Sequence, residues 1–186
     1  SGVEPLVWPG TDLRPAFQRA TAVLVSAGPG PEGDPVLGKA RPAITEGAKH
    51  LSWVGYLSTT GVYGDHGGEW VDETTPLTPS TERGRARVAA EADWQSIPGL
   101  PLHIFRLAGI YGPGRGPFEK VRSGSARRII KPGQVFSRIH VEDIVAAILA
   151  SMDAPNPQRI YNIADGHPAP PQDVLDYAAD SLGAAR

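Results

Sequence analysis

The chain has 186 residues, a formal net charge of −2 at pH 7 and no cysteine. This length suits one globular domain or a domain and a half, and the lack of cysteine excludes disulfides, thiolate metal sites and a cysteine nucleophile. The near-neutral charge argues against nucleic-acid binding, which normally requires a basic surface. No apolar stretch is long enough to span a bilayer, and residues 1–5 lack the features of a secretory signal. We therefore expect a cytoplasmic protein with neither a membrane nor a nucleic acid as its partner.

Short apolar runs alternate along the chain with segments of helical pattern. Strands are predicted at residues 22–26, 53–58, 102–107 and 160–164. Helices are predicted to begin at residue 35 and to span residues 81–95, 141–152 and 171–182. Asp34 followed by Pro35 is typical of a helix start, because a side-chain acceptor precedes a residue that has no N–H to satisfy. This alternation predicts an α/β fold with a parallel sheet flanked by helices.

Residues 54–64, VGYLSTTGVYG, are the most informative segment. An apolar run breaks there into three hydroxyl side chains and then into an aromatic turn between glycines. Ligands of open parallel sheets bind outside the carboxyl ends of the strands, so Ser58, Thr59 and Thr60 are candidate site residues. A buried strand closed by a hydroxyl-rich turn is the structural alternative. The five histidines have no metal-ligand spacing, so no metal site is expected.

Five segments of the chain, one of which contains these three hydroxyl residues, together resemble a known family. They are YLSTTGVYG at 56–64, DETTPLTP at 72–79, FRLAGIYGPGR at 105–115, RIHVEDIVAAI at 138–148 and YNIADGHP at 161–168. In this order they resemble the extended short-chain dehydrogenase/reductases, the NAD-dependent epimerase/dehydratase group, and most of all its atypical bacterial members. The resemblance covers nearly the whole chain. It implies a Rossmann-like sheet truncated at the N-terminus, in which residue 1 lies beyond the first two strands and Val3–Trp8 forms the third.

The resemblance also implies a division of the chain and a function. Residues 1–109 and 139–164 are expected to form the NAD(P)-binding core without its first two strands, and residues 110–138 and 165–186 part of a substrate-binding region. The expected cofactor is NAD or NADP, and the expected activity is that of an epimerase/dehydratase or oxidoreductase. The expected partners are a small anionic substrate, such as a nucleotide sugar, and a second copy of the chain in a homodimer.

The catalytic residues that the resemblance implies are only partly present. Thr59 matches the family's catalytic Ser/Thr, three residues before the Val-Tyr-Gly of 62–64, and would hydrogen-bond the reacting oxygen of the substrate. The window that matches the family's Tyr-x-x-x-Lys begins with Arg83 and ends with Arg87. Arginine stays protonated and cannot replace the tyrosine as general acid or base, although Arg87 can supply the positive charge that lysine gives the nicotinamide ribose.

A plain helix surface is the alternative for Arg83 and Arg87. In that case Arg87 would pair with Glu91 on the exposed side, as residues four apart in a helix do. Independently of this alternative, the residues of the helix available for burial are Val88, Ala89, Ala92 and Trp94.

Further contacts follow from the same resemblance. The cofactor is expected against Ser26, Ala27, Gly28, Ser58, Arg87, Leu107, Ala108, Gly109 and Ile110. The substrate is expected against Thr60, Tyr63, Arg115 and Arg138. The excess of basic residues over 115–138 suits an anionic substrate, or else forms a solvated surface. Gly28–Gly33 spells Gly-x-Gly-x-x-Gly, but Pro29 and Pro31 remove N–H groups that phosphate binding needs, so a ribose contact or a plain loop is expected there.

Two alternatives to an enzyme stay open. A non-catalytic dinucleotide-binding or regulatory protein fits the loss of the Tyr-x-x-x-Lys pair. An inactive fragment of a longer enzyme fits the missing glycine turn.

Overall fold

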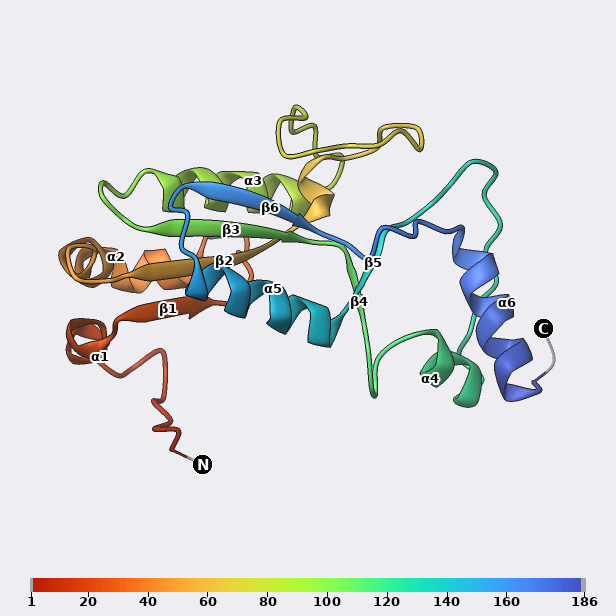
Figure 1. The fold of residues 1–186 in the computed structure, drawn as a ribbon, viewed down its shortest axis with the longest axis horizontal. Coiled ribbons are helices and arrows are strands. Elements are labelled where there is room, and N and C mark those ends of the chain that lie inside the picture. Colours follow the sequence, from red (N-terminus) through yellow and green to blue (C-terminus); the bar gives the residue numbers. More distant parts are fainter. Residues whose placement is uncertain (1, 185–186) are drawn as a thin grey trace.

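A parallel sheet of four strands forms the centre of the computed structural model, which describes residues 2–184. The strands lie in the order β1-β2-β3-β6 (Figure 1). They are β1 (Ala22–Val25), β2 (Trp53–Thr59), β3 (Leu102–Leu107) and β6 (Arg159–Ile163). The α/β fold with a Rossmann-like parallel sheet is thereby confirmed.

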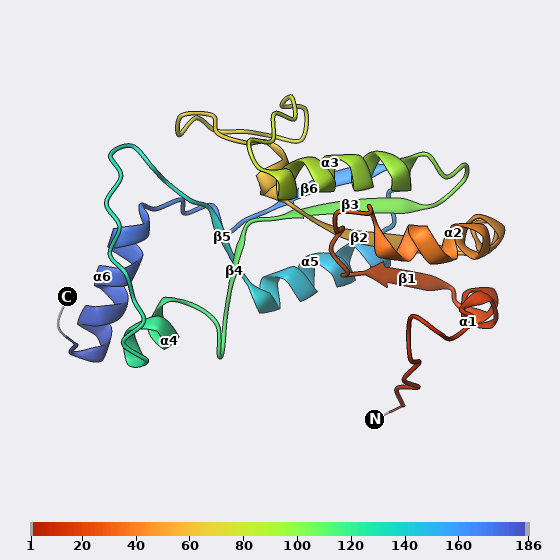
Figure 2. The same cartoon turned by 180° about the vertical axis from the view of Figure 1, so that it is seen from behind.

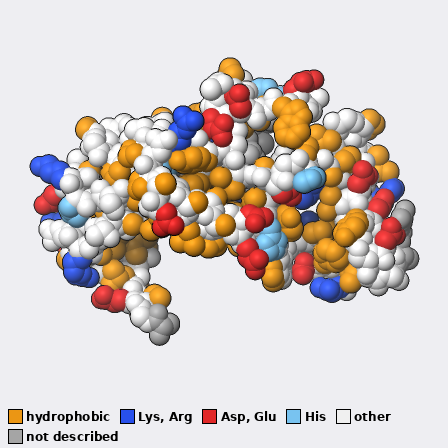
Figure 3. All heavy atoms as spheres, viewed as in Figure 1, with side chains coloured by type: hydrophobic (Ala, Val, Ile, Leu, Met, Phe, Trp, Pro, Cys, Tyr) orange, Lys and Arg blue, Asp and Glu red, His pale blue; other side chains and the backbone are white. Residues whose placement is uncertain are grey.

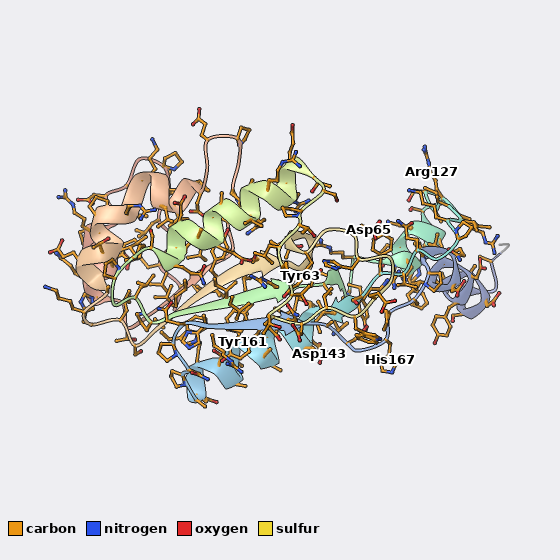
Figure 4. All side chains as sticks on the ribbon, turned by 90° about the horizontal axis from the view of Figure 1, so that it is seen from above. Tyr63, Asp65, Arg127, Asp143, Tyr161 and His167 are labelled. Carbon is orange, nitrogen blue, oxygen red and sulfur yellow. The ribbon has the colours of Figure 1, made fainter. Side chains whose placement is uncertain are left out.

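Helices cover the two faces of the sheet unequally. α2 (Pro35–Gly47) and α3 (Glu82–Gln95) lie on one face, and α5 (Val141–Asp153) lies on the other (Figures 2 and 4). Successive strand residues point to opposite faces, so Val54 and Tyr56 pack in the core with α2 and α3, whereas Trp53 packs with Ile144 and Ile148 of α5. Each face therefore has a hydrophobic core of its own.

Side-chain caps set the starts of the two helices on the first face. Asp34 Oδ1 accepts hydrogen bonds from the N–H groups of Val36 at 2.9 Å and Leu37 at 3.0 Å, as expected for a helix that begins at Pro35. Asp34 Oδ2 also accepts a hydrogen bond from Trp94 Nε1 at 3.2 Å. The cap of α2 thus fastens that helix to α3.

The buried side of α3 differs from the expected one. The residues buried there are Gly84, Arg87, Ala90, Glu91 and Trp94. Ala89 and Ala92 are exposed, so only Trp94 of the expected core residues is fully buried. Charged residues occupy this side because the sheet and its loops supply them with partners.

The expected strand at Val3–Trp8 is wrong. Residues 2–7 have no regular secondary structure, and the first element is the short helix α1 (Arg14–Arg19). Within residues 2–184 the edge strand β1 hydrogen-bonds to β2 alone, so Val3–Trp8 pairs with no strand of the sheet. An extended segment becomes a stable strand only when it pairs with another.

A smaller part projects beyond the carboxyl ends of the strands (Figure 1). The short strands β4 (Gly109–Tyr111) and β5 (Arg138–His140) pair in parallel and lead into it. It contains α4 (Pro117–Arg122) and α6 (Pro171–Leu182), which pack against each other. Within residues 2–184, no helix combines the length and the apolar character needed to cross a bilayer.

Candidate functional site

Thr59 lies at the carboxyl end of β2, where the strand turns into the 3-10 helix η1 (Thr60–Val62). Its Oγ1 accepts a hydrogen bond from Gly61 N at 3.1 Å and so caps that turn. The proton of the hydroxyl has no acceptor within residues 2–184. Thr59 and Thr60 are both half-buried. The cap therefore orients the Thr59 hydroxyl and leaves its proton for a ligand.

Ser58 points the other way, into the layer between the sheet and α3. Its side chain is buried, and its hydroxyl donates to Glu91 Oε1 at 2.5 Å. Because the proton is held by the carboxylate, Ser58 can only accept a hydrogen bond from any further group. The two neighbouring hydroxyls, Ser58 and Thr59, thus have different chemical roles available to them.

Glu91 also forms a buried ion pair with Arg106 of β3. Arg106 Nη2 lies 2.8 Å from Glu91 Oε2, and Arg106 Nε lies 3.2 Å from Oε1. The side chains are 3% and 2% exposed, respectively, so both charges are removed from water. Burial alone would lower the pKa of Arg106, but the hydrogen bonds with Glu91 and Tyr63 outweigh it and raise that pKa. The Arg106 guanidinium therefore stays charged, and it contacts Glu91 through two nitrogen atoms.

Tyr63 continues this network to β6. Its hydroxyl accepts a hydrogen bond from Arg106 Nη1 at 2.8 Å and donates one to Asn162 Oδ1 at 2.7 Å. The Arg106 guanidinium also lies 5.0 Å from the centre of the Tyr63 ring. From the loop at 64–79, Glu73 Oε1 accepts a hydrogen bond from Asn162 N at 2.6 Å. Tyr63, which was expected to contact the substrate, is buried and links β3 to β6 through its hydroxyl. It lies between the sheet and the projecting part (Figure 4).

Arg87 reaches from α3 to the ends of β1 and β2. Its Nη1 donates to Leu57 O at 2.7 Å and to the Tyr56 hydroxyl at 3.1 Å. Burial raises the pKa of Tyr56 to about 12, against the opposing effect of the Arg87 cation, so this tyrosine stays neutral. Arg87 Nε and Nη2 have no hydrogen-bond partner within residues 2–184. Three N–H groups of this guanidinium are therefore left for water or a ligand.

The alternative of an exposed Arg87–Glu91 pair is wrong, because both side chains are buried and each has other partners. Arg83 differs from Arg87: it is exposed and has no ion-pair or hydrogen-bond partner within residues 2–184. Of these two arginines, Arg87 is the one that contacts the carboxyl end of β2.

Gly28 leaves the space that Arg87 occupies. A Cβ atom at Gly28 would lie 2.9 Å from Arg87 Nη2, which is too close for the guanidinium to stay in place. Gly30 and Gly33 bond to each other in a tight turn, N to O at 3.0 and 3.1 Å. Their N–H groups are therefore occupied, in agreement with the expectation that the Gly-x-Gly-x-x-Gly match is no phosphate cradle. Ser26 and Gly28 are exposed, and Ala27 is half-buried.

The segment after β3 passes from the sheet into the projecting part. Leu107 and Ala108 are buried, so a cofactor there would meet their backbone and not their side chains. Ala108 N bonds to Ile163 O at 3.0 Å, and Gly109 N bonds to Ser137 O at 3.1 Å. Gly109 is exposed and Ile110 is half-buried at the start of β4.

The two arginines expected at the substrate differ in their surroundings. Arg138 Nη1 donates to Phe136 O at 3.0 Å and to Ala169 O at 3.4 Å, so it holds two loops together. Arg115 is exposed, in a turn closed by the hydrogen bond from Gly112 N to Arg115 O at 2.9 Å. Asp143 and His167 lie near the junction of the two parts of the molecule (Figure 4).

Sequence reasoning missed Glu91 and Asn162 as links in the buried network. Their signal in the sequence is indirect: Glu91 shares one side of the helical pattern with Gly84, Ala90 and Trp94, which are small or aromatic residues typical of a packed side. No comparable pattern marks Asn162, because its role depends on a loop far away in the sequence.

Comparison with known proteins relates this geometry to a family. A model of the NAD dependent epimerase/dehydratase family matches residues 43–164. A functionally unknown conserved protein from Silicibacter pomeroyi DSS is 59% identical, with a TM-score of 0.93 over 98% of this chain and 64% of that chain. Protein YeeZ of Escherichia coli (strain K12) is 41% identical over 116 residues, which cover 61% of this chain and 40% of YeeZ.

A more distant structure shares the fold. The dTDP-glucose 4,6-dehydratase from Bacillus anthracis, solved in complex with NAD, is 21% identical and has a TM-score of 0.73, over 89% of this chain and 58% of that one. The chain thus spans less than two thirds of the length of each of these three proteins.

Proposed function

Because this chain belongs to the NAD-dependent epimerase/dehydratase family, we propose that it binds the nicotinamide half of NAD or NADP at the carboxyl ends of β1 and β2. The observation that carries this proposal is Arg87, a largely buried side chain whose guanidinium has only one nitrogen engaged. Its free N–H groups lie beside Gly28, whose missing side chain leaves the guanidinium the space that it occupies. The dehydratase from Bacillus anthracis supports the choice of cofactor, since it was solved with NAD.

The residues fit one half of the dinucleotide better than the other. Arg87 offers free donors to hydroxyl or carbonyl oxygens of the nicotinamide half. The N–H groups of Gly30 and Gly33 are engaged with each other, so that loop offers little to a pyrophosphate. We propose that residues 2–184 hold the nicotinamide ribose and contribute little to binding the adenosine.

The substrate would lie between the core at 1–109 and 139–164 and the region at 110–138 and 165–186. Thr59 would donate its free proton to an oxygen of the substrate and so orient the reacting carbon toward the nicotinamide, which supplies or accepts a hydride when bound. The exposed Arg115 suits an anionic group, as in a nucleotide sugar.

A non-catalytic dinucleotide-binding protein is the second candidate. The position of the family's tyrosine carries Arg83, which cannot shuttle a proton. The hydroxyl of Tyr63 already donates a hydrogen bond to Asn162, so Tyr63 does not replace that tyrosine as general acid or base. This candidate predicts cofactor binding without turnover of any substrate.

A titration with NADH and NADPH, followed by nicotinamide fluorescence, tests the proposal. We expect saturable binding that weakens at least tenfold in Arg87→Met, a variant of similar length without the guanidinium. Arg83→Met is the matched control, because Arg83 lies one turn away on the same helix and is exposed. Equal binding by both variants would contradict the role of Arg87. With binding established, Thr59→Val should abolish any turnover and leave NADH affinity within about twofold.

A further inference from the structure

The connection between α5 and β6, residues 154–158, lies at the amino ends of the strands, away from the candidate site (Figure 1). Its residues are exposed, yet two backbone hydrogen bonds tie it to β3. Gln158 N donates to Leu102 O at 2.7 Å. Asn156 N donates to His103 Nε2 at 3.0 Å. The side chain of a buried histidine thus fastens an exposed connection.

The hydrogen bond to His103 depends on the protonation state of its imidazole. Asn156 lies between Pro155 and Pro157, which have no N–H group, so its own N–H is the single backbone donor of this stretch. Because Nε2 accepts that hydrogen bond, the neutral ring carries its proton on Nδ1. The imidazolium carries a proton on both nitrogens and accepts none. Protonation of His103 therefore removes the acceptor of Asn156.

The same ring supports the end of α5. It stacks on the indole of Trp53, with the ring centres 5.7 Å apart. Trp53 Nε1 in turn donates to the hydroxyl of Ser151, in the last turns of α5, at 3.0 Å. Gly55, which neighbours His103 in register on β2, leaves the space for the indole, since a Cβ atom there would overlap it. His103 is thus part of the packing that holds α5.

The surroundings of His103 favour its neutral form. The ring is 0% exposed, and Nδ1 has no hydrogen-bond partner within residues 2–184. Burial lowers the pKa of His103, and the backbone carbonyl groups of Val54 and Pro101 oppose this effect only in part.

The charged residues of the neighbouring elements do not offset the burial of the ring. Asp153 at the end of α5 and Arg159, the neighbour in register on β6, are both exposed, and neither acts on the pKa of His103. Trp53 and Gly55 of β2 and Ser151 of α5 are uncharged. An imidazolium at this position would therefore be a buried charge without a counter-charge, which is strongly unfavourable.

Apolar contacts hold the rest of α5 on the sheet. Ile144 and Ile148 pack into the core on this face. Figure 3 shows hydrophobic side chains gathered in the middle of the face, over α5 and the sheet. Such packing is not directional, so the polar contacts of Ser151 and Asn156 determine where α5 ends and the chain turns toward β6.

We propose that His103 and Asn156 form a pH-sensitive latch, in which the neutral imidazole keeps residues 154–158 closed and its protonation releases them together with the end of α5. The step is the binding of one proton from water to Nε2, after which the N–H of Asn156 bonds to water. A local movement is sufficient, because the connection is already exposed on its outer side. The latch needs no cofactor, so it is independent of the proposed function.

The direction of the pH dependence follows from the pKa in the two forms. In the open form the ring is in water, with a pKa of about 6.5, and in the closed form burial lowers that pKa. The closed form is therefore fully favoured above about pH 6.5, and this preference is lost as the pH falls toward the lower pKa.

Amide hydrogen exchange at pH 7.5 and pH 5.0 tests the latch, after correction for the intrinsic pH dependence of exchange. We expect the protection of the amides of Asn156 and Gln158 to fall about tenfold between these two values. His103→Gln keeps an acceptor that does not titrate, so it should remove most of this fall. The matched control is His50→Gln, at an exposed histidine after α2, which should leave the fall unchanged.

An NMR titration of the unchanged chain provides a second test that requires no variant. The ring nitrogen shifts of His103 should show a neutral ring with its proton on Nδ1 at pH 7.5. Protonation of the ring should coincide with the loss of protection at Asn156. Circular dichroism checks that His103→Gln folds, and the titration decides alone if it does not.

Three outcomes would overturn the proposal. The first is equal protection of Asn156 and Gln158 at pH 7.5 and pH 5.0. The second is a fall in protection that persists in folded His103→Gln, or that occurs while the ring nitrogens of His103 keep their neutral shifts. The third is protection of these amides equal to that of the β2 amides at both pH values, because the whole domain and not the connection would then be opening.

Discussion

Removing the charge of Glu91 should be the most destabilising conservative change in the chain. Glu91→Gln keeps the shape of the side chain and an acceptor for the Ser58 hydroxyl, but it leaves the Arg106 guanidinium buried without a counter-charge. Breaking one side of a buried ion pair costs about 3–5 kcal/mol, because the remaining charge is not solvated. Domains have a total stability of about 5–15 kcal/mol, so this loss is a large share of it.

Thermal and urea unfolding measure this loss. For a domain of this size, each kcal/mol shifts the Tm by about 2–4 °C, so we expect a fall of about 6–20 °C. Trp94 is buried, and its fluorescence reports the unfolding of the core. The matched control is Asp93→Asn on the same helix, whose exposed carboxylate lies 3.7 Å from Arg41 Nη2 and which should change stability by less than about 1 kcal/mol.

A double variant separates lost charge from lost packing. Glu91→Leu combined with Arg106→Met removes both charges, and replacing a whole buried pair by apolar residues is often neutral. It should therefore be more stable than Glu91→Leu alone. If Glu91→Gln costs less than about 1 kcal/mol, or if the double variant is no better than the single one, the buried pair does not carry the energy assigned to it.

Three other predictions concern separate residues. Burial lowers the pKa of His103 in the folded protein below its unfolded pKa of about 6.5. The stability that the neutral imidazole contributes is therefore complete above that unfolded pKa and is lost as the pH falls toward the folded pKa. His103→Gln should reduce the loss of stability between pH 7 and pH 5, measured by urea unfolding. Asp34→Ala removes the cap of α2 and the acceptor of Trp94 Nε1, and should cost about 1–2 kcal/mol, whereas Asp34→Asn should retain most of that stability. Gly28→Ala should displace the Arg87 guanidinium and weaken NADH binding at least tenfold with little change in Tm, and unaltered binding would refute the close approach.

Much of the fold was predictable because its signals are local. The apolar runs and the Asp34-Pro35 start depend only on neighbouring residues, and the structure has the sheet and the α2 start where they were expected. Val3–Trp8 was not predictable in the same way, since a strand needs a partner that the local sequence does not reveal.

The buried network was harder to predict than the sheet. A charged residue in a helix is usually solvated, so an exposed Arg87–Glu91 pair stood as the alternative to the cofactor contact that the resemblance implied for Arg87. Their burial depends on partners far away in the sequence, Leu57 for the first and Arg106 for the second. The edge position of Thr59 was predictable from the strand and its glycine turn, but its free proton follows from the cap on Gly61, which required the structure.

Competition against bound NADH tests the central claim most directly, because that claim assigns the nicotinamide half of the cofactor to Arg87, beside Gly28. Nicotinamide mononucleotide carries this half alone, and AMP carries the adenosine half alone. We predict that nicotinamide mononucleotide displaces NADH at concentrations within about tenfold of the NAD concentration that does so, which corresponds to about 1.4 kcal/mol. Displacement by AMP at a lower concentration than by nicotinamide mononucleotide would contradict the account.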